Sequence, residues 1–333
     1  MEDYPVSVVI PYFNGSSFIV RALKSIAEQT LPALEVIIVD DGSHETELAF
    51  LQNLIGEFDF LLVSQSNYGQ SAARNLGAKY SKGKLICFLD QDDWFLPHHI
   101  NDLVQTFIAH ETQPLVYGKY TRNYSCLTSQ GFSPPGGRNP KIRFQDQVDL
   151  FKANLMIVPS CILVSKEVFD EVGGFDETLR GYEDDDIVIR VVMSGGEVIE
   201  LPWAISVWSR VPTSSSHSKT MIHSQRVFFY KWQLRLQSLR IEADVHRLFL
   251  NRFSKVAASQ LLRQSLDSKQ SYLECKEFGQ EILNRAKESD FGLFDIPYRI
   301  LLRFFVALTE RKTRSLAFFL VPILNALNSL QRR

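Results

Sequence analysis

Three aspartates stand at the end of an apolar segment, where their charges crowd together. Asp90, Asp92 and Asp93 follow residues 85–89, whose sequence Leu-Ile-Cys-Phe-Leu is typical of a strand buried on both faces. Adjacent carboxylates repel one another, and a divalent cation with oxygen ligands offsets that repulsion while it bridges to substrate phosphates. The pattern therefore predicts a metal site that holds an anionic ligand, with a solvated acidic turn as the alternative.

A second group of acids lies much further along the chain. Glu183 and Asp184 open a run of four consecutive acids, and the sequence predicts a helix from there to about residue 194. Acids stabilise a helix N-terminus, but this explains one or two acids better than four. Crowding by like charges raises the pKa of a carboxyl group, which is the direction that a general base requires. The run therefore indicates acid–base chemistry, with helix-terminus electrostatics as the alternative.

The elements that must position these acids alternate between strand and helix. Strands are predicted at residues 6–10, 36–39, 60–63, 85–89 and 160–164, and helices after residue 14 or 16, through 48–54, at about 71–80, from Pro97 and at 166–172. Apolar strands that alternate with helices predict an α/β fold with a mostly parallel sheet covered on both faces. Ligands bind at the carboxyl ends of such strands, where Asp40, Asp41 and the acids at 90–93 fall.

The composition is that of a globular protein with an uneven distribution of charge. The 333 residues are 45% hydrophobic and 22% charged, enough for one large domain and an appendage. Residues 1–209 carry 15 Lys and Arg against 28 Asp and Glu, whereas residues 210–333 carry 21 against 10. We expect the acidic part to bind the metal and the basic part to face an anionic membrane or acceptor, with solvated helix faces as the alternative.

Cysteine usage and the amino-terminal sequence predict a cytoplasmic protein. The four cysteines are far apart and show no C-x-x-C spacing, which favours free thiols in a reducing compartment. Residues 1–3 are acidic where a signal peptide would be basic, and no apolar run reaches about 18 residues. A helix that spans a membrane is therefore not expected.

Five short motifs occur in a recognisable order. They are Val-Val-Ile-Pro-Tyr-Phe-Asn at 8–14, Val-Asp-Asp-Gly-Ser at 39–43, Asn-Tyr-Gly-Gln-Ser-Ala-Ala-Arg-Asn at 67–75, Phe-Leu-Asp-Gln-Asp-Asp at 88–93 and Gly-Tyr-Glu-Asp at 181–184. Each is weak alone, but together they make roughly residues 4–210 resemble the family 2 glycosyltransferases, inverting enzymes with the GT-A fold. The resemblance implies a Rossmann-like catalytic domain of the GT-A type at residues 1–215, followed by a helical C-terminal region at 216–333.

The resemblance also implies which residues bind the nucleotide. Pro11, Phe13 and Asp41 occupy the positions that hold the base and ribose, with Asp40 nearby. A carboxylate accepts hydrogen bonds from base or ribose, and an aromatic ring stacks on the base. The alternatives are strand-end packing for Pro11 and Phe13 and an Asx-type turn for Asp40.

Further members of the implied donor site come from the first and third motifs. Asn14, Asn67 and Gly69 complete the set, and Gly69 suits a tight turn before a helix. Arg74 is expected to pair with the acidic cluster or with the diphosphate, because its planar guanidinium matches both. A position on a solvated helix face is the alternative for Arg74.

The resemblance implies a different role for each of the three aspartates in the metal motif. Asp92 is the first choice for direct ligation, Asp90 contacts ribose or metal-bound water, and Asp93 completes the shell or caps the helix beyond Trp94. The cation, Mn²⁺ or Mg²⁺, stabilises charge on the departing nucleoside diphosphate. Oxygen ligands suit both ions, so the sequence does not choose between them.

The last motif implies the residue that handles the proton. Asp184 matches the general base of the family, which removes the acceptor hydroxyl proton while the sugar is displaced with inversion, and Glu183 is its partner in the motif. Arg190 is expected to pair with an acid structurally. Four further residues are candidates for acceptor contacts or for a segment that closes over the diphosphate, with core packing as the alternative for the two tryptophans: Trp203, Trp208, Arg210 and His217.

The expected partners follow from the same resemblance. The donor is a nucleotide sugar, with UDP as its expected carrier, and the acceptor is a hydroxyl of a glycan or lipid-linked glycan; no nucleic acid is implied. The apolar residues 297–327, broken by basic residues, are expected either to lie peripherally on the inner face of a membrane, or to pack on the helical region or in a homodimer contact. Two other functions stay open: a sugar-phosphate nucleotidyltransferase, although only Gly15 stands where that class carries a Gly-rich loop, and a non-catalytic nucleotide- or glycan-binding protein.

Overall fold

The computed structural model describes most of the chain. The described residues are 4–122, 141–142, 157–209, 220–238 and 269–288, together with single residues and short stretches between residues 144 and 317. The chain forms two compact units, one of residues 1–150 and 155–218 and the other of residues 151–154 and 219–333. Each unit is described by itself.

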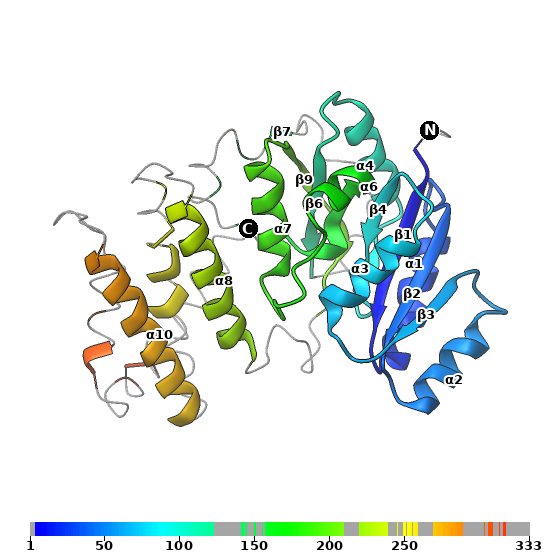
Figure 1. The fold of residues 1–333 in the computed structure, drawn as a ribbon. Coiled ribbons are helices and arrows are strands. Elements are labelled where there is room, and N and C mark those ends of the chain that lie inside the picture. The colour runs from blue at the N-terminus through cyan, green and yellow to red at the C-terminus, as the bar shows by residue number, and fades with distance from the viewer. Residues whose placement is uncertain are drawn as a thin grey trace. The chain divides into compact units, whose positions relative to one another are not determined.

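The first unit is an α/β structure built on one mixed sheet (Figure 1). Its elements run in the order β1 Val6–Tyr12, α1 Ser16–Ala27, β2 Glu35–Asp41, α2 Glu45–Leu54, β3 Leu61–Gln65, α3 Gln70–Tyr80, β4 Leu85–Phe88, β5 Trp94–Phe95, α4 His99–Ile108, β6 Leu115–Thr121, β7 Lys141–Ile142, β8 Ile162–Ser165, α6 Lys166–Glu171, α7 Glu183–Met193 and β9 Val198–Val207. The α/β alternation expected from the sequence is confirmed.

The sheet has a parallel half and a mixed half. Its strand order within the described residues is β3-β2-β1-β4-β8-β6-β9-β5, and β7 pairs with β9. Strands β1 to β4 are parallel, with Val8 opposite Val36 on one side and Cys87 on the other. Strand β8 runs antiparallel to both β4 and β6. The parallel half therefore places the carboxyl ends of β1, β2 and β4 at one edge.

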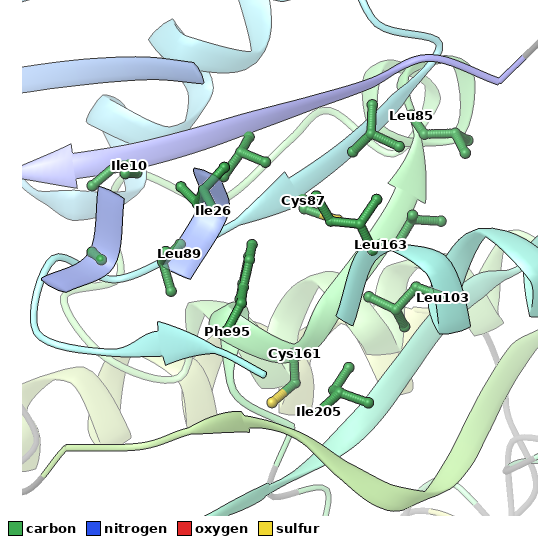
Figure 2. Packing of buried hydrophobic residues seen from close by; sticks show 14 of the residues in the cluster. Ile10, Ile26, Leu85, Cys87, Leu89, Phe95, Leu103, Cys161, Leu163 and Ile205 are labelled. Carbon is green, nitrogen blue, oxygen red and sulfur yellow. The ribbon is translucent and has the colours of Figure 1, made fainter. Parts of the chain in front are cut away.

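Helix α1 covers one face of the parallel strands. Its buried residues Ile19, Leu23 and Ile26 lie on one helical face. They belong to a core that includes Ile10 and Leu89, part of which is shown in Figure 2. Because side chains of a strand alternate between faces, only every second residue of β1 contributes to this core.

Helix α3 covers the opposite face of the same strands. Ala73 packs on Ile37 and Val39, and a Cβ at Gly77 would lie 2.3 Å from Cγ1 of Val9. The small residues of α3 thus allow the helix to approach the sheet closely. This approach brings the N-terminal end of α3, which carries Arg74, near the ends of the strands.

Several element boundaries differ from those expected. Helix α1 has Gly15 at its N-cap, without a side-chain bond from Asn14 or Ser16, because Glu47 of α2 accepts the N–H of Ser16 at 3.0 Å instead. Helix α4 begins at His99, two residues after Pro97. A 3-10 turn occupies Pro159–Cys161, where a strand was expected from residue 160.

The second unit is helical in its described part. Helices α8 Thr220–Ser238 and α10 Lys269–Glu288 are linked by an ion pair between Arg226 and Glu281, and the ring of Phe229 packs against Phe278 with centroids 5.7 Å apart. The expected helical C-terminal region is confirmed. Most of the apolar residues 297–327 lie outside the described part of the chain. None of the helices that the structure describes is long and apolar enough to cross a membrane.

Three cysteines lie among the described residues, and none of these three forms a disulfide bond. Cys87, Cys161 and Cys275 are buried. Burial raises the pKa values of Cys87 and Cys161 above their ordinary value, which keeps both thiols protonated and unreactive. These thiols act as small apolar core groups.

Candidate active site

The loops after β1 and β2 are joined by a polar side chain. Asn14 has a left-handed φ of 47°. Its N–H donates to Oγ of Ser43 at 2.9 Å, and its Oδ1 accepts the N–H of His44 at 3.0 Å. The first and second sequence motifs are therefore held together by Asn14 itself.

The two acids that end β2 organise loops. Oδ1 of Asp40 accepts the N–H of Ser43 at 3.1 Å, which is the Asx-type turn that the sequence left open for this residue. The carboxylate of Asp41 accepts the N–H groups of Tyr68 and Gly69 at 2.8 and 2.9 Å, and also the Gln65 side-chain amide at 2.8 Å. Asp41 thus fixes the third motif against the second.

Close backbone approach adds to this arrangement. Gly42 has a φ of 77°, and a Cβ there would lie 2.8 Å from the backbone nitrogen of Asn67. Two aromatic rings at the same edge remain open to solvent: Phe13 is 43% exposed and Tyr68 is 63% exposed. An exposed aromatic ring at the end of a strand can stack on a nucleobase. The contacts of Pro11 and Phe13 with a nucleotide stay predictions.

The hydrogen bonds from Asp41 to the third motif, residues 67–75, can be tested by substitution. We expect Asp41→Asn to lower the free energy of unfolding by about 1–3 kcal/mol. In asparagine an NH2 group, which cannot accept a hydrogen bond, replaces one of the carboxylate oxygens that accept the N–H groups. Urea unfolding measures the loss. Asp59→Asn removes an exposed acid in the same unit and is the matched control. Equal stability of the two variants would contradict the anchoring role.

Arg74 connects the acidic loop, residues 90–93, to helix α7. Its side chain is 1% exposed, with one guanidinium nitrogen 2.5 Å from Oδ1 of Asp90 and the other 3.0 Å from Oε1 of Glu183. Burial lowers the pKa of Arg74, and the two carboxylates more than offset this, so its pKa is raised overall. The same Glu183 oxygen accepts the side-chain amide of Gln70. The sequence-predicted residues Arg74, Asp90 and Glu183 are thus brought together.

Helix α7 begins under backbone strain beside its acids. Tyr182 at the N-cap has a φ of 69°, a left-handed conformation that few non-glycine residues adopt. Asp184 is half-buried, and Oδ1 accepts the N–H of Asp185 at 2.8 Å. Burial first, and then the neighbouring Asp185 and Glu183, raise the pKa of Asp184 well above its ordinary value. Asp184 therefore has the property that a general base needs.

The acids of the loop after β4 have separate surroundings. Both oxygens of Asp93 accept hydrogen bonds, one from the hydroxyl of Ser160 at 2.6 Å and one from the N–H of Ser209 at 2.8 Å. Burial and then Asp90 raise the pKa of Asp93. Asp92 is half-buried, and burial followed by the charge of Asp90 raises its pKa to about 6. Its carboxylate therefore carries a charge that its surroundings disfavour.

The donor set around Asp92 fits a hard divalent cation. No group of three His, Cys, Asp or Glu side chains arranged to hold a metal occurs within the described ranges. Mg²⁺, however, commonly takes only one or two carboxylates, and waters and substrate phosphates complete its shell. Among the residues described, no other side chain donates to the Asp92 carboxylate, whereas Asp90 and Asp93 already accept protein donors. The ligand roles of all three aspartates stay predictions.

The raised pKa of Asp92 has a consequence for stability. A carboxyl group whose pKa is higher in the folded protein than its unfolded value of roughly 3.9 favours folding at low pH and opposes it once both states are ionised. Without metal, we expect Asp92→Asn to melt at nearly the wild-type temperature at pH 4 and about 5–10 °C above it at pH 7, because a shift of about two pKa units corresponds to about 3 kcal/mol. Calorimetry of the chelator-treated proteins measures this, with Glu28→Gln as an exposed control. A difference independent of pH would contradict the assignment.

Several contacts at the site could not be found from the sequence. Gln70, Ser160 and Arg21 each join segments far apart in the chain; the guanidinium of Arg21 stacks on Trp94 at 3.8 Å and donates to the backbone oxygen of Asp92 at 2.8 Å. Tyr68 is an exposed aromatic residue of the third motif, in which the sequence predicted roles only for Asn67, Gly69 and Arg74. No sequence signal connects these partners.

The remaining candidates have mixed outcomes. The indole N–H of Trp203 donates to Asp102 at 3.0 Å, and its ring packs on the core. Core packing was the alternative to an acceptor contact for this residue. Trp208 packs edge-on against Tyr120 and precedes Ser209, whose N–H donates to Asp93. Arg190 pairs with Asp186 at 2.8 Å, in the expected structural role. Arg210 and His217 lie outside the described residues.

Comparison with known proteins identifies what this chain resembles. The model of the family described as Glycosyl transferase family 2 matches residues 7–173. An uncharacterized glycosyltransferase of Haemophilus influenzae is 28% identical over 191 residues, which cover 56% of this chain and 62% of that protein. The match thus spans less than two-thirds of the relative's length.

Two solved structures share the fold. A crystal structure of S. aureus TarS 1–349 in complex with UDP-GlcNAc has a TM-score of 0.63 and 17% identity and covers 90% of each chain. The mannosyltransferase PcManGT from Pyrobaculum calidifontis, in complex with GDP-Man and Mn²⁺, has a TM-score of 0.55 and 16% identity, and the match covers 96% of this chain and 85% of that one. At these identities the likeness concerns the fold, and it confirms the expected GT-A-type architecture.

Proposed function

Because the chain belongs to glycosyl transferase family 2, we propose that it is an enzyme that moves a sugar, with inversion, from a nucleotide-sugar donor to a hydroxyl of a glycan or lipid-linked glycan. The two structural neighbours contain UDP-GlcNAc and GDP-Man, and we propose a UDP sugar as the donor here. We also propose that the enzyme works in the cytoplasm, with its basic C-terminal region on the inner face of a membrane or in a homodimer.

One observation carries this proposal: the buried ion-pair bridge from Asp90 through Arg74 to Glu183. Asp90 belongs to the acidic loop, and Glu183 stands next to Asp184. The guanidinium of Arg74 therefore holds the proposed diphosphate site and the proposed base at a fixed separation. Sugar transfer requires this geometry, because the leaving group and the incoming hydroxyl lie on opposite sides of the reacting carbon. Positioning of this kind supplies much of an enzyme's rate advantage.

The donor would lie across the carboxyl ends of β1, β2 and β4. The exposed ring of Phe13 stacks on the base, and the loop of Asn67 and Gly69, held by Asp41, contacts the nucleotide. Asp92 would hold a divalent cation, with Asp90 beside it toward ribose or metal-bound water. When bound, the cation supplies Lewis-acid stabilisation of the charge on the departing diphosphate.

Asp184 would take the proton from the acceptor hydroxyl. Its raised pKa strengthens its affinity for a proton, which is the direction that a general base requires. Glu183 pairs with Arg74 and is one of the two neighbouring acids that raise the pKa of Asp184. We propose that Asp184 is the catalytic base and that Glu183 positions it.

The two alternative functions are separated by one set of assays. We expect purified protein with Mn²⁺ or Mg²⁺ to release the nucleoside diphosphate, by transfer of the sugar to water, from one donor within a panel of UDP, GDP and dTDP sugars, and a chelator to abolish the release. A nucleotidyltransferase would instead release pyrophosphate from UTP and a sugar 1-phosphate. A binding protein would be stabilised thermally by the nucleotide sugar without any release. Either of these results would overturn the proposal.

A further inference from the structure

Gln91 lies between two of the acidic-loop aspartates, and its side chain reaches the loop after β1. The N–H of Phe13 donates to its Oε1 at 2.9 Å, and its Nε2 donates to the carbonyl oxygen of Phe13 at 3.1 Å. One side-chain amide thus satisfies both backbone groups of a single residue, as a neighbouring strand would. Backbone pairing of β1 with β4 ends where the N–H of Leu89 donates to Val9. Among the described contacts, the Gln91 pair is the next link between these loops.

The residue at position 15 leaves room for this pairing. A Cβ on Gly15 would lie 2.3 Å from Oε1 and 2.5 Å from Cδ of Gln91. Gly15 has a φ of −115°, which any residue adopts, so the glycine is needed here for space rather than for its conformational freedom. Since the obstructing atoms end a flexible side chain, alanine at position 15 would displace the Gln91 amide without obstructing the fold.

We propose that Gln91 is a positioning residue that couples the base loop, residues 13–15, to the acidic loop, residues 90–93. This inference rests on the proposed function, in which the base stacks on Phe13 and Asp92 holds the cation. Each loop loses conformational freedom when its ligand binds. Because the Gln91 pair ties the loops, ordering of one by its ligand favours ordering of the other. Nucleotide and cation therefore bind cooperatively through this link.

The affinity for UDP or GDP, measured calorimetrically with and without Mn²⁺, reports the coupling. For Gln91→Ala and Gly15→Ala we expect the enhancement by Mn²⁺ to fall by about tenfold, within the usual range of coupling between sites. The donor KM should rise with kcat at saturation changed far less, because Asp184 is untouched. Hydrogen exchange of the Phe13 amide should be faster in both variants. Gln52→Ala, at an exposed position on helix α2, is the matched control.

A double variant makes the test specific. If Gly15→Ala acts by displacing the Gln91 amide, it should change neither coupling nor Phe13 exchange when Gln91 is already alanine. Equal effects of Gly15→Ala in both backgrounds, or a Gln91→Ala protein with wild-type exchange and coupling, would overturn the proposal. If the wild-type protein binds neither nucleotide, the proposed function fails, and Phe13 exchange across the four proteins still decides whether Gln91 ties the loops.

Discussion

Asp184→Asn is expected to lower kcat for sugar transfer by about 10²–10⁴-fold, the usual contribution of a general base. Asparagine keeps the size of the side chain but cannot take a proton at this position. Donor affinity should stay within about twofold, because Asp184 faces the acceptor in the proposed geometry. Steady-state kinetics and calorimetric donor binding measure the two quantities.

The pH dependence of the wild-type enzyme gives the same prediction a second form. The base works only when ionised, and burial and neighbouring acids raise the pKa of Asp184. Transfer should therefore be lost as pH falls through that raised pKa, above the range where an ordinary aspartate titrates. Glu171→Gln, at an exposed position on α6, should keep the wild-type profile. Full transfer by Asp184→Asn with normal donor binding would show that the base has been assigned wrongly.

Arg74→Met is expected to produce the largest loss of stability. It would remove the guanidinium that Asp90 and Glu183 share. Breaking a buried ion pair by removing one partner costs about 3–5 kcal/mol. Urea unfolding measures the loss. Lys24→Met is the matched control, because Lys24 is an exposed lysine on α1 and its loss should cost less than about 1 kcal/mol.

A second substitution keeps this test decisive if Arg74→Met folds poorly. Glu183→Gln in the same chain removes one of the two uncompensated charges, so the double variant should be more stable than Arg74→Met alone. Arg74→Lys should fall between wild type and Arg74→Met, since lysine keeps the charge without the planar fork that reaches both acids. A loss for Arg74→Met no larger than that for Lys24→Met would contradict the bridging role.

The sequence predicted the parallel half of the sheet because its signals are local. The apolar runs at β1, β2 and β4 and the periodicity of α1 reflect burial of these segments on the sheet. Boundaries were less predictable where a distant residue intervenes. Glu47, on the next helix, accepts the first N–H of α1, so the group that caps this helix end lies 31 residues away and has no local sequence signal.

The sequence motifs name residues that the fold brings together, but they do not give the contacts that join them. Arg74, Asp90 and Glu183 lie at one location, yet the bridge joins residues 109 positions apart and has no sequence signal. The Asx-type turn at Asp40 had a local signal in the Asp-Asp-Gly-Ser sequence. The Gln91 pair had none, because a polar residue between two aspartates reads as solvated until its partner, Phe13, is seen.

The central claim is that the acidic loop and helix α7 form one site for a nucleotide sugar and its metal. A crystal structure of the protein with a hydrolysis-resistant UDP sugar and Mn²⁺, with the ion located by its anomalous scattering, tests this most directly. We predict the ion at Asp92 in contact with the diphosphate, the base on Phe13 and the sugar facing Asp184. An ion bound away from residues 90–93, or a nucleotide bound away from the carboxyl ends of β1, β2 and β4, would contradict the claim.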